Sequence, residues 1–348
     1  MSIAKLINEG VEYPLKRIDN DVFSVFGDYE LKKKTFMENS EEIEDTIEFE
    51  PERDRELTKE KTAFIIPIFS FKSENSKVVL ENFEKTKESL CDEDVFVVEM
   101  SYLNNDFIIP DSENFIRIQA NERHLLWQKE RLFNLALDKL PKKYKNVAWV
   151  DGDIIFKNQS SLSVMIDEAL SEHSAVQLFS DVNWLDEHRQ PFRTQKSCIL
   201  NSRNGWHGYA WAFRREEIEK IGGMFDYHIS GNGDLMLNYA FSITGSTKSM
   251  PKRTLNECVS MKKKFNKYKD KVSKYFLGTV TCLDLEIDHQ YHGDYRTRKY
   301  EYRENLLRKY KFNPETDIEI DKNGLYKWKF EREEAKRLFH DIFMYMIK

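Results

Sequence analysis

The sequence predicts an α/β protein with a mixed, mostly parallel central sheet that is flanked by helices. From residue 62 onward, short β-prone apolar runs alternate with amphipathic helical segments, which is the pattern of an open α/β sheet. One run, Val147–Val150, is apolar throughout, as expected for a strand that is buried on both faces. Two acidic residues follow it directly, and ligands of open α/β sheets bind beyond the carboxyl ends of the strands.

The expected elements follow one another in a regular order. The first half contains strands at 62–70, 94–100, 114–120 and 147–150, with helices at 77–90 and 122–140; Pro67 and Ser70 end the first strand, and Pro141 stops the second helix. The second half contains a helix at 160–170, a strand at 174–185 that runs into a loop, a late strand that ends near two histidines, a basic helix and a last helix at 330–348.

Composition limits the possible functions. The 348 residues are 40% hydrophobic, which is enough for one large core or two smaller ones. The formal charge is −6 and basic residues are interspersed with acidic ones, so nucleic-acid binding is not expected. Four scattered cysteines indicate neither a zinc knuckle nor a disulfide framework. With no long apolar segment, we expect no transmembrane helix and a cytoplasmic location. The sequence leaves the oligomeric state open.

Asp151 and Asp153 are the residues that indicate chemistry. Burying two unpaired carboxylates at a strand end is costly unless a cation or a basic partner faces them. Oxygen ligands favour Mg²⁺ or Mn²⁺, which bind through one or two carboxylates while substrate phosphates fill other positions. The alternative is a solvated turn with two ordinary acids, but the apolar residues on both sides of the pair favour a metal site.

Three stretches together resemble the nucleotide-sugar-dependent glycosyltransferases of the GT-A fold. WVDGDIIF, residues 149–156, looks like the DxD motif of that fold. Residues 208–234 are similar to the acceptor-side segment of galactosyltransferase and N-acetylgalactosaminyltransferase families, and residues 289–303 to a late segment that supplies a histidine metal ligand. The resemblance covers about residues 62–310 and implies a Rossmann-like GT-A fold. It also implies transfer from a nucleotide-sugar, with a UDP-sugar favoured, to a hydroxyl of a glycan or other acceptor.

The resemblance assigns metal ligands. Asp153, and Asp151 directly or through water, would hold Mn²⁺ (or Mg²⁺) at the diphosphate of the donor. His292 would add a nitrogen ligand, which favours Mn²⁺. His289 is an alternative, and because the two would face opposite sides of a strand, we expect at most one to bind the metal. His292 is preferred since Gly293 beside it permits close approach.

Asp234 is the expected general base. It would take the proton from the acceptor hydroxyl, a role that suits an inverting enzyme. In a retaining enzyme it would bind sugar hydroxyls instead. A third possibility is that Asp234 is the N-cap of the helix that begins there, which is compatible with either role.

Further residues are expected to contact the substrates. Flat aromatic faces and small residues suit the sugar side, although strand aromatics are more often core, so only one or two of the aromatic residues should bind. The candidates for sugar binding are Trp206, His207, Gly208, Tyr209, Trp211 and Gly233. Those for the nucleotide end are Pro67, Ser70, Arg131, Asn134 and Asp151, with Arg123 and Lys129 ranked behind them.

The domain organisation is expected to have three parts. Residues 1–60 are highly charged and form an N-terminal extension or lid. Residues 61–310 form the GT-A domain, with a nucleotide-sugar half at about 61–158 and an acceptor half at about 159–310. Residues 311–348 form a C-terminal helical extension, so helical additions are expected at both ends.

Two other functions stay open. Gly231-Asn232-Gly233-Asp234 has one acid where the resembled families have two, so the chain could be a catalytically silent GT-A-fold protein that binds glycans or serves as a scaffold. A phosphatase of the haloacid-dehalogenase type also places an Asp-x-Asp after a buried strand. It ranks lower because Ile154 and Ile155 follow the pair in place of Gly-Thr, and because the pair comes late in the domain.

Overall fold

A computed structural model divides the chain into two compact units, Met1–Thr58 and Lys59–Lys348. In the second unit it describes residues 61–69, 76–90, 92–103, 105–110, 114–157, 161–243, 250–293 and 299–346, and in the first residues 5–8, 11–19, 22–25 and 29–32. None of the helices it describes is long and apolar enough to span a membrane.

The N-terminal unit contains a small antiparallel sheet. Its strands, in spatial order, are β1 (Lys5–Asn8), β2 (Val11–Asp19), β3 (Val22–Val25) and β4 (Tyr29–Lys32). The addition at this end is therefore a sheet, and our expectation of a helical one is wrong. Short β-prone segments such as Val22–Val25 are compatible with strand pairing, but in so highly charged a region they are too short to predict strands from the sequence.

The second unit is built on a seven-stranded sheet, which confirms the predicted mixed, mostly parallel α/β fold. Only β13 runs antiparallel to its neighbours. The spatial order is β14 (Thr279–Cys282), β10 (His173–Gln177), β13 (Ala210–Arg214), β8 (Asn146–Val150), β5 (Thr62–Phe69), β6 (Asp94–Tyr102) and β7 (Phe115–Ala120).

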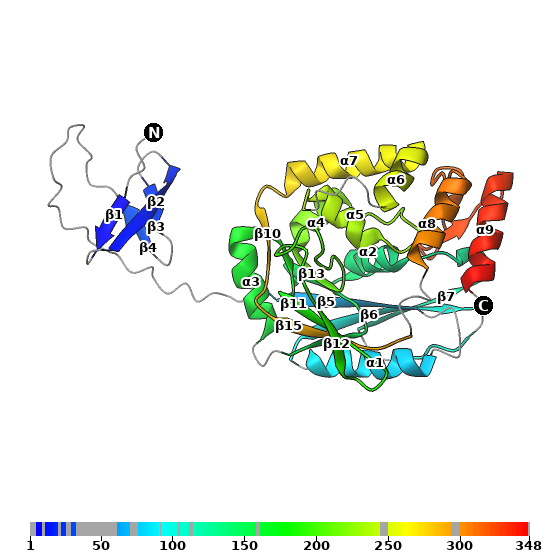
Figure 1. The fold of residues 1–348 in the computed structure, drawn as a ribbon, viewed down its shortest axis with the longest axis horizontal. Coiled ribbons are helices and arrows are strands. Elements are labelled where there is room, and N and C mark those ends of the chain that lie inside the picture. The colour runs from blue at the N-terminus through cyan, green and yellow to red at the C-terminus, as the bar shows by residue number, and fades with distance from the viewer. Residues whose placement is uncertain are drawn as a thin grey trace. The chain divides into compact units, whose positions relative to one another are not determined.

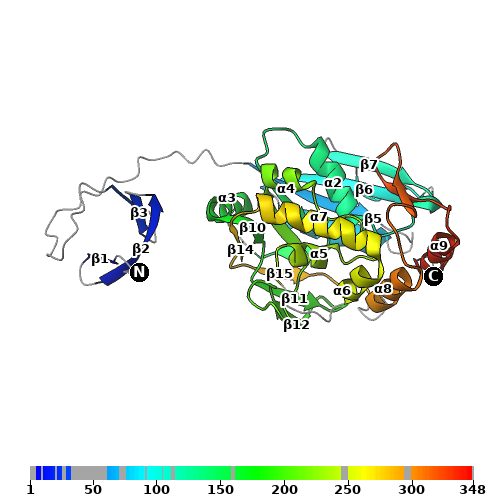
Figure 2. The same cartoon turned by 90° about the horizontal axis from the view of Figure 1, so that it is seen from above.

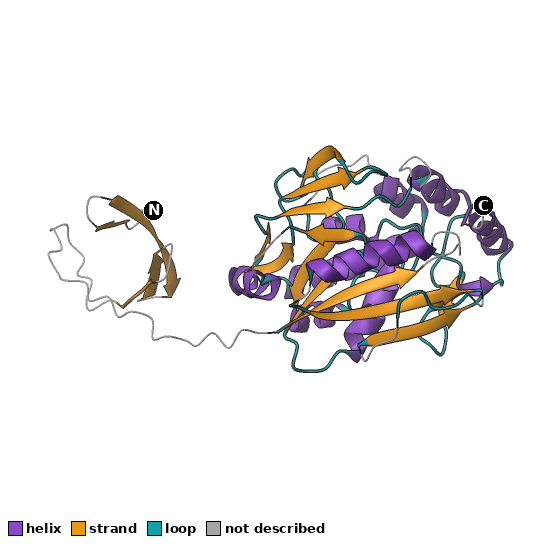
Figure 3. Cartoon of the chain, turned by 90° about the horizontal axis from the view of Figure 1, so that it is seen from below, coloured by secondary structure: helices purple, strands orange, loops and turns teal. Residues whose placement is uncertain are grey.

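Side-chain alternation along the strands divides the core into two layers. In β5, Ala63 and Ile65 face one layer while Phe64 and Ile66 face the other. One face is covered by α1 (Ser76–Ser89) and α3 (Leu162–Glu172), as Figures 1 and 3 show. The other is covered by α2 (Lys129–Lys139), α4 (Arg215–Ile221), α5 (Gly233–Ala240), α6 (Met250–Glu257), α7 (Val259–Tyr275), α8 (Tyr300–Lys309) and α9 (Glu333–Met346) (Figure 2).

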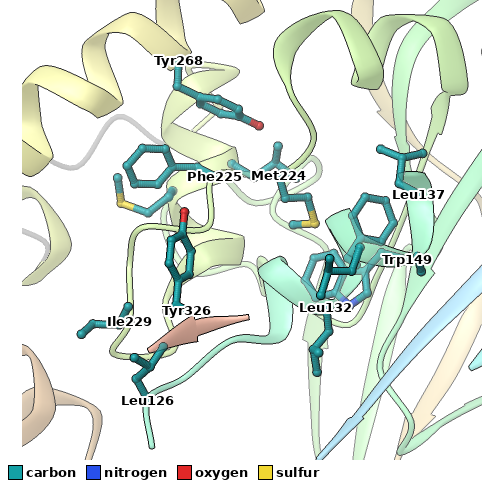
Figure 4. Close-up of a cluster of buried hydrophobic side chains, with 14 of the residues drawn as sticks. Leu126, Leu132, Leu137, Trp149, Met224, Phe225, Ile229, Tyr268 and Tyr326 are labelled. Atoms are coloured by element: carbon teal, nitrogen blue, oxygen red, sulfur yellow. The ribbon is translucent and has the colours of Figure 1, made fainter. Parts of the chain in front are cut away.

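Two expected boundaries are corrected in the first half of this unit. Pro67 does not end the first strand but lies inside β5, opposite Val98 of β6. It is tolerated there because β8 pairs with β5 only as far as Ile65, so a missing N–H at residue 67 breaks no bond to β8. The expected helix at 122–140 is shorter: Glu122–His124 form a 3-10 turn, and α2 begins only at Lys129. Figure 4 shows Leu132 and Leu137 of α2 beside Trp149 of β8.

A second, four-stranded sheet adjoins the central one. Its order is β12 (Pro191–Lys196), β11 (Asp181–Leu185), β15 (Glu286–His289) and β9 (Ile154–Phe156). The single strand expected at 174–185 is therefore two strands, β10 and β11, in different sheets. This sheet matters for function because β9 follows the Asp-x-Asp pair directly and runs antiparallel to β15, which ends at His289.

The C-terminal segment is not wholly helical. A hairpin of β16 (Ile318–Ile320) and β17 (Tyr326–Trp328) precedes α9. Trp328 is fully buried in the core layer that contains α2, and its indole N–H donates to the Leu125 carbonyl at 2.8 Å. The segment is therefore packed into the main core of this unit.

Candidate metal and acceptor site

The Asp151-Gly152-Asp153 turn joins the two sheets. It leaves the carboxyl end of β8 in the central sheet and enters β9 in the second sheet. The Asp151 N–H donates to the Tyr209 carbonyl at 2.7 Å, which anchors the turn to the segment before β13. A Cβ atom on Gly152 would lie 2.4 Å from Cδ1 of Ile68, so a larger residue there would require the buried Ile68 side chain to move.

Asp153, His289 and His292 form one cluster. The Asp153 Oδ2 atom lies 2.9 Å from Nε2 of His292 and 3.5 Å from Nε2 of His289, and the two Nε2 atoms are 3.3 Å apart. Our expectation that the two histidines face opposite sides is wrong. Strand β15 ends at His289, so strand alternation does not apply to His292, and the Gln290 N–H donates to the Asp153 carbonyl at 2.9 Å.

The donor set of this cluster fits a divalent transition metal. One ligand atom from each of the three residues lies within 4.8 Å of the others, and no further group of this kind is found among the described residues. The second carboxylate oxygen of Asp153, Oδ1, is buried and accepts no hydrogen bond from any described residue. Burial alone would raise the pKa of Asp153, but the two imidazoles outweigh it and hold that pKa well below its usual range. One carboxylate with two imidazoles is a set that favours Mn²⁺ over Mg²⁺.

Asp151 does not belong to the cluster of metal-ligand atoms. Its carboxylate accepts from the Trp149 indole N–H at 2.9 Å and pairs with the Lys129 ammonium at 3.1 Å. Burial raises the pKa of Asp151, against the effect of Lys129. Burial would lower the pKa of Lys129, but Asp151, Asp234 and Glu130 outweigh it and raise that pKa. Lys129, which we ranked behind the other nucleotide candidates, is the first residue of α2 and contacts Asp151 at the end of β8.

Asp234 lies in the first turn of α5, close to the same strand end. The N-cap of α5 is Asn232, so Asp234 is inside the helix, and the N-cap interpretation is wrong. A Cβ atom on Gly208 would lie 2.5 Å from the Asp234 Oδ2 atom, which shows how closely that carboxylate approaches the backbone before β13. Gly233 is equally constrained, since its Cβ would lie 2.2 Å from the Cδ atom of Glu130. Burial raises the pKa of Glu130 to about 7.

Of the aromatic candidates, only Trp206 and His207 are partly exposed. Trp211 is fully buried and donates to the His207 carbonyl at 2.8 Å, so its ring cannot stack on a sugar. Tyr209 is also buried, and its ring stacks on that of His289 with centroids 4.8 Å apart. We therefore correct both expectations: Trp211 is a core residue and Tyr209 supports His289. Burial lowers the pKa of His207.

The expected nucleotide contacts from α2 have structural partners instead. The Asn134 amide donates to the Met224 carbonyl at 2.9 Å and accepts from the Met224 N–H at 2.7 Å. Arg131 donates to the Gly324 carbonyl at 2.6 Å and pairs with Asp226 at 3.3 Å. These contacts attach α2 to the loop before α5 and to the C-terminal hairpin, so we correct the nucleotide role of both residues. Ser70, another expected contact, lies outside the described residues.

A buried ion pair supports the loop that leads to Asp234, and the sequence offered no signal for it. His228 and Glu304, both fully buried, are 3.0 Å apart. Glu304 also accepts from Ser230 at 2.6 Å, from Asn232 at 2.8 Å and from Thr254. Burial alone would raise the pKa of Glu304, but His228 and these hydrogen bonds lower that pKa to about 2. Burial alone would lower the pKa of His228, but Glu304 outweighs it and raises that pKa.

Comparison with known proteins finds distant structural similarity only. No protein-family model matches the chain, and no curated protein matches it. Similar solved structures include S. aureus TarS 1-349 in complex with UDP-GlcNAc, with 12% identity, 82% of this chain and 72% of that chain covered, and a TM-score of 0.40. Another is the mannosyltransferase PcManGT from Pyrobaculum calidifontis in complex with GDP-Man and Mn²⁺, with 11% identity, 72% and 62% covered, and a TM-score of 0.36.

A third similar structure is the catalytic domain of Drosophila beta1,4-galactosyltransferase 7 with xylobiose. It shares 12% identity over 64% of each chain, with a TM-score of 0.30. The chain thus spans less than two thirds of this structure, and 38% of a longer TarS chain. These similarities are distant.

Proposed function

We propose that this chain is a metal-dependent glycosyltransferase of the GT-A type. It transfers a sugar from a nucleotide-sugar, with a UDP-sugar favoured, to a hydroxyl of a glycan or other acceptor, and it inverts the anomeric configuration. The observation that carries the proposal is convergence. The Asp-x-Asp turn, the acceptor-side segment and the late histidine segment, far apart in the sequence, meet at the carboxyl end of β8.

Asp153, His289 and His292 would hold the cation, and Mn²⁺ suits this donor set better than Mg²⁺. When bound, the ion supplies positive charge that stabilises a departing diphosphate. Lys129 keeps its proton in this environment and holds the Asp151 carboxylate in place. The metal-binding side of the site is therefore formed by the end of β15 with His292 after it, by the Asp151–Asp153 turn and by the start of α2.

Asp234 would accept the proton of the acceptor hydroxyl. Its carboxylate lies in the first turn of α5 and closely approaches the backbone at Gly208, just before β13. Trp206 is partly exposed and lies beside Gly208, where a Cβ atom would be 3.5 Å from its indole nitrogen, so it is a candidate for contact with the acceptor. His207, kept neutral by burial, is a second candidate for contact with the acceptor.

Calorimetric titration with UDP-, GDP- and TDP-sugars, with and without Mn²⁺, tests the donor side. We expect one donor class to bind only with Mn²⁺, and Asp153→Asn to abolish this binding. The exposed Asp138→Asn on α2 is the matched control and should bind like the parent. If no nucleotide-sugar shows metal-dependent binding, and Asp153→Asn behaves like the parent, the proposal is wrong.

Transfer to a panel of acceptors tests the second half of the reaction. Asp234→Asn should retain donor binding but lose turnover by roughly 10²- to 10⁴-fold, the usual contribution of a general base. NMR of the product should show the inverted anomer, and a retained anomer would contradict the role of Asp234. If the chain binds a donor but neither transfers the sugar to any acceptor of the panel nor slowly hydrolyses the donor, the result would instead favour a catalytically silent glycan-binding protein.

A further inference from the structure

Helix α7 is strongly basic in a chain whose net charge is −6. Its 17 residues include seven lysines and a single acidic residue, Asp270. The helix lies on the outside of the helical layer, where Figures 1 and 2 show it in yellow along one face of the second unit. The rest of the chain is correspondingly more acidic, so α7 carries a local excess of positive charge.

The lysines of α7 lie on its solvent side. Its apolar residues Met261, Phe265, Tyr268 and Val272 are buried against the protein. Six lysines are exposed: Lys262, Lys263, Lys267, Lys269, Lys271 and Lys274. Within the part of the chain that the structure describes, the half-buried Lys264 is the one lysine of α7 with a carboxylate within 4 Å, at 3.7 Å from Glu315. The exposed lysines therefore give this surface a net positive charge, although the exposed Asp270 lies among them.

Two apolar side chains stand at the ends of this basic surface. Val259 begins the helix and is 75% exposed, and Leu277, two residues beyond its end, is 84% exposed. These are the two most exposed large hydrophobic residues in the described part of the chain. At about 1.5 Å per residue, the helix between them is on the order of 25 Å long.

This combination points to one kind of partner. Lysines extend to lipid phosphates while aliphatic side chains enter the boundary between headgroups and acyl chains. Single-stranded nucleic acid is bound through aromatic stacking, but Tyr268 is buried and Tyr275 is only partly exposed. A nucleic-acid duplex would use the lysines but would gain nothing from Val259 and Leu277. We propose that the solvent face of α7, with Val259 and Leu277 at its ends, is a docking surface for a bilayer that contains anionic lipid. The inference does not depend on the proposed glycosyl transfer, although α5, which carries Asp234, packs against α7.

Vesicle flotation of the full chain tests this surface. Phosphatidylcholine vesicles with and without phosphatidylglycerol are compared at low and high salt. We expect binding only to the anionic vesicles, weakened by salt, and reduced about tenfold or more by Lys263→Glu/Lys267→Glu, because each basic residue near an anionic surface contributes severalfold to partitioning. The matched control is Lys77→Glu/Lys87→Glu on α1, which covers the opposite face of the sheet and should leave binding unchanged.

A second pair of variants separates a bilayer from other polyanions. Val259→Ser/Leu277→Ser replaces exposed side chains, so the melting temperature should stay the same while vesicle binding falls. The proposal is overturned if anionic and neutral vesicles bind equally, or if charge reversal on α7 has no effect. It is also overturned if heparin or duplex DNA binds as tightly as the vesicles and the serine variant binds them all like the parent.

Discussion

The cluster of Asp153, His289 and His292 leads to a quantitative prediction for metal binding. An ion that binds only the folded chain stabilises it by RT ln(1 + [M]/Kd), about 2.7 kcal/mol when the ion is at about 100 times its Kd. In a folded unit of the size of Lys59–Lys348, 1 kcal/mol shifts the melting temperature by about 2 °C. Mn²⁺ at that concentration should therefore raise the melting temperature by about 5 °C.

Asp153→Asn removes the one anionic ligand of the cluster. A loss of about 100-fold in affinity is expected, since even changes in groups that only orient a ligand cost 10- to 100-fold. At the same Mn²⁺ concentration the stabilisation then falls to about 0.4 kcal/mol, and the shift to less than about 1 °C.

Thermal unfolding with and without Mn²⁺ measures this shift within each protein, so any effect of Asp153→Asn on the metal-free fold cancels. The exposed Asp138→Asn should keep the full shift. Three protein ligands also imply that chelation returns the parent to its metal-free melting temperature. If Asp153→Asn keeps the full shift, or if neither Mn²⁺ nor Mg²⁺ shifts the parent, the assignment of a metal site is refuted.

Three further predictions concern neighbouring residues. Alanine at His289 should weaken Mn²⁺ binding about as much as alanine at His292, because both contact the same carboxylate; calorimetry that finds either histidine dispensable would contradict the three-ligand site. Glu304→Gln should lower the free energy of unfolding by about 3 kcal/mol. In urea denaturation this difference should be largest between about pH 4.5 and 6.5. The ion pair weakens as the pH falls toward the lowered pKa of Glu304, and it weakens again as the pH rises through the raised pKa of His228. A difference that does not change with pH would contradict this prediction. Gly208→Ala should reduce transfer by on the order of 100-fold with Mn²⁺ binding unchanged, because its Cβ displaces the carboxylate in the first turn of α5; equal losses of both would contradict this.

The architecture of the second unit could largely be predicted from local patterns. Buried parallel strands such as β5 and β8 need continuous apolar runs, and helices such as α1 and α3 need an apolar stripe, so both leave a signal in the sequence. Where the prediction failed, the local signal was weak or was overridden. Pro67 is tolerated inside β5 because of where β8 ends, and the hairpin of β16 and β17 is too short to show a period.

For the site, the sequence by itself determined which residue types were present and where the strand that carries them ends. An apolar run followed by Asp151 and Asp153 predicts carboxylates at the edge of an α/β sheet, because buried strands end where charge begins. The late histidines and Asp234 were identified differently, from the resemblance of their segments and of the order of those segments to GT-A glycosyltransferases.

Only the tertiary structure decided which of these residues lie together in the metal-ligand cluster and which have other partners. Pairing of β9 with β15 brings both histidines to Asp153, while the start of α2 places Lys129 against Asp151 and keeps that carboxylate out of the cluster. Burial removed Trp211 from the candidates for sugar binding. The physical reason is that each of these outcomes depends on contacts between segments far apart in the chain, and no local pattern encodes such contacts.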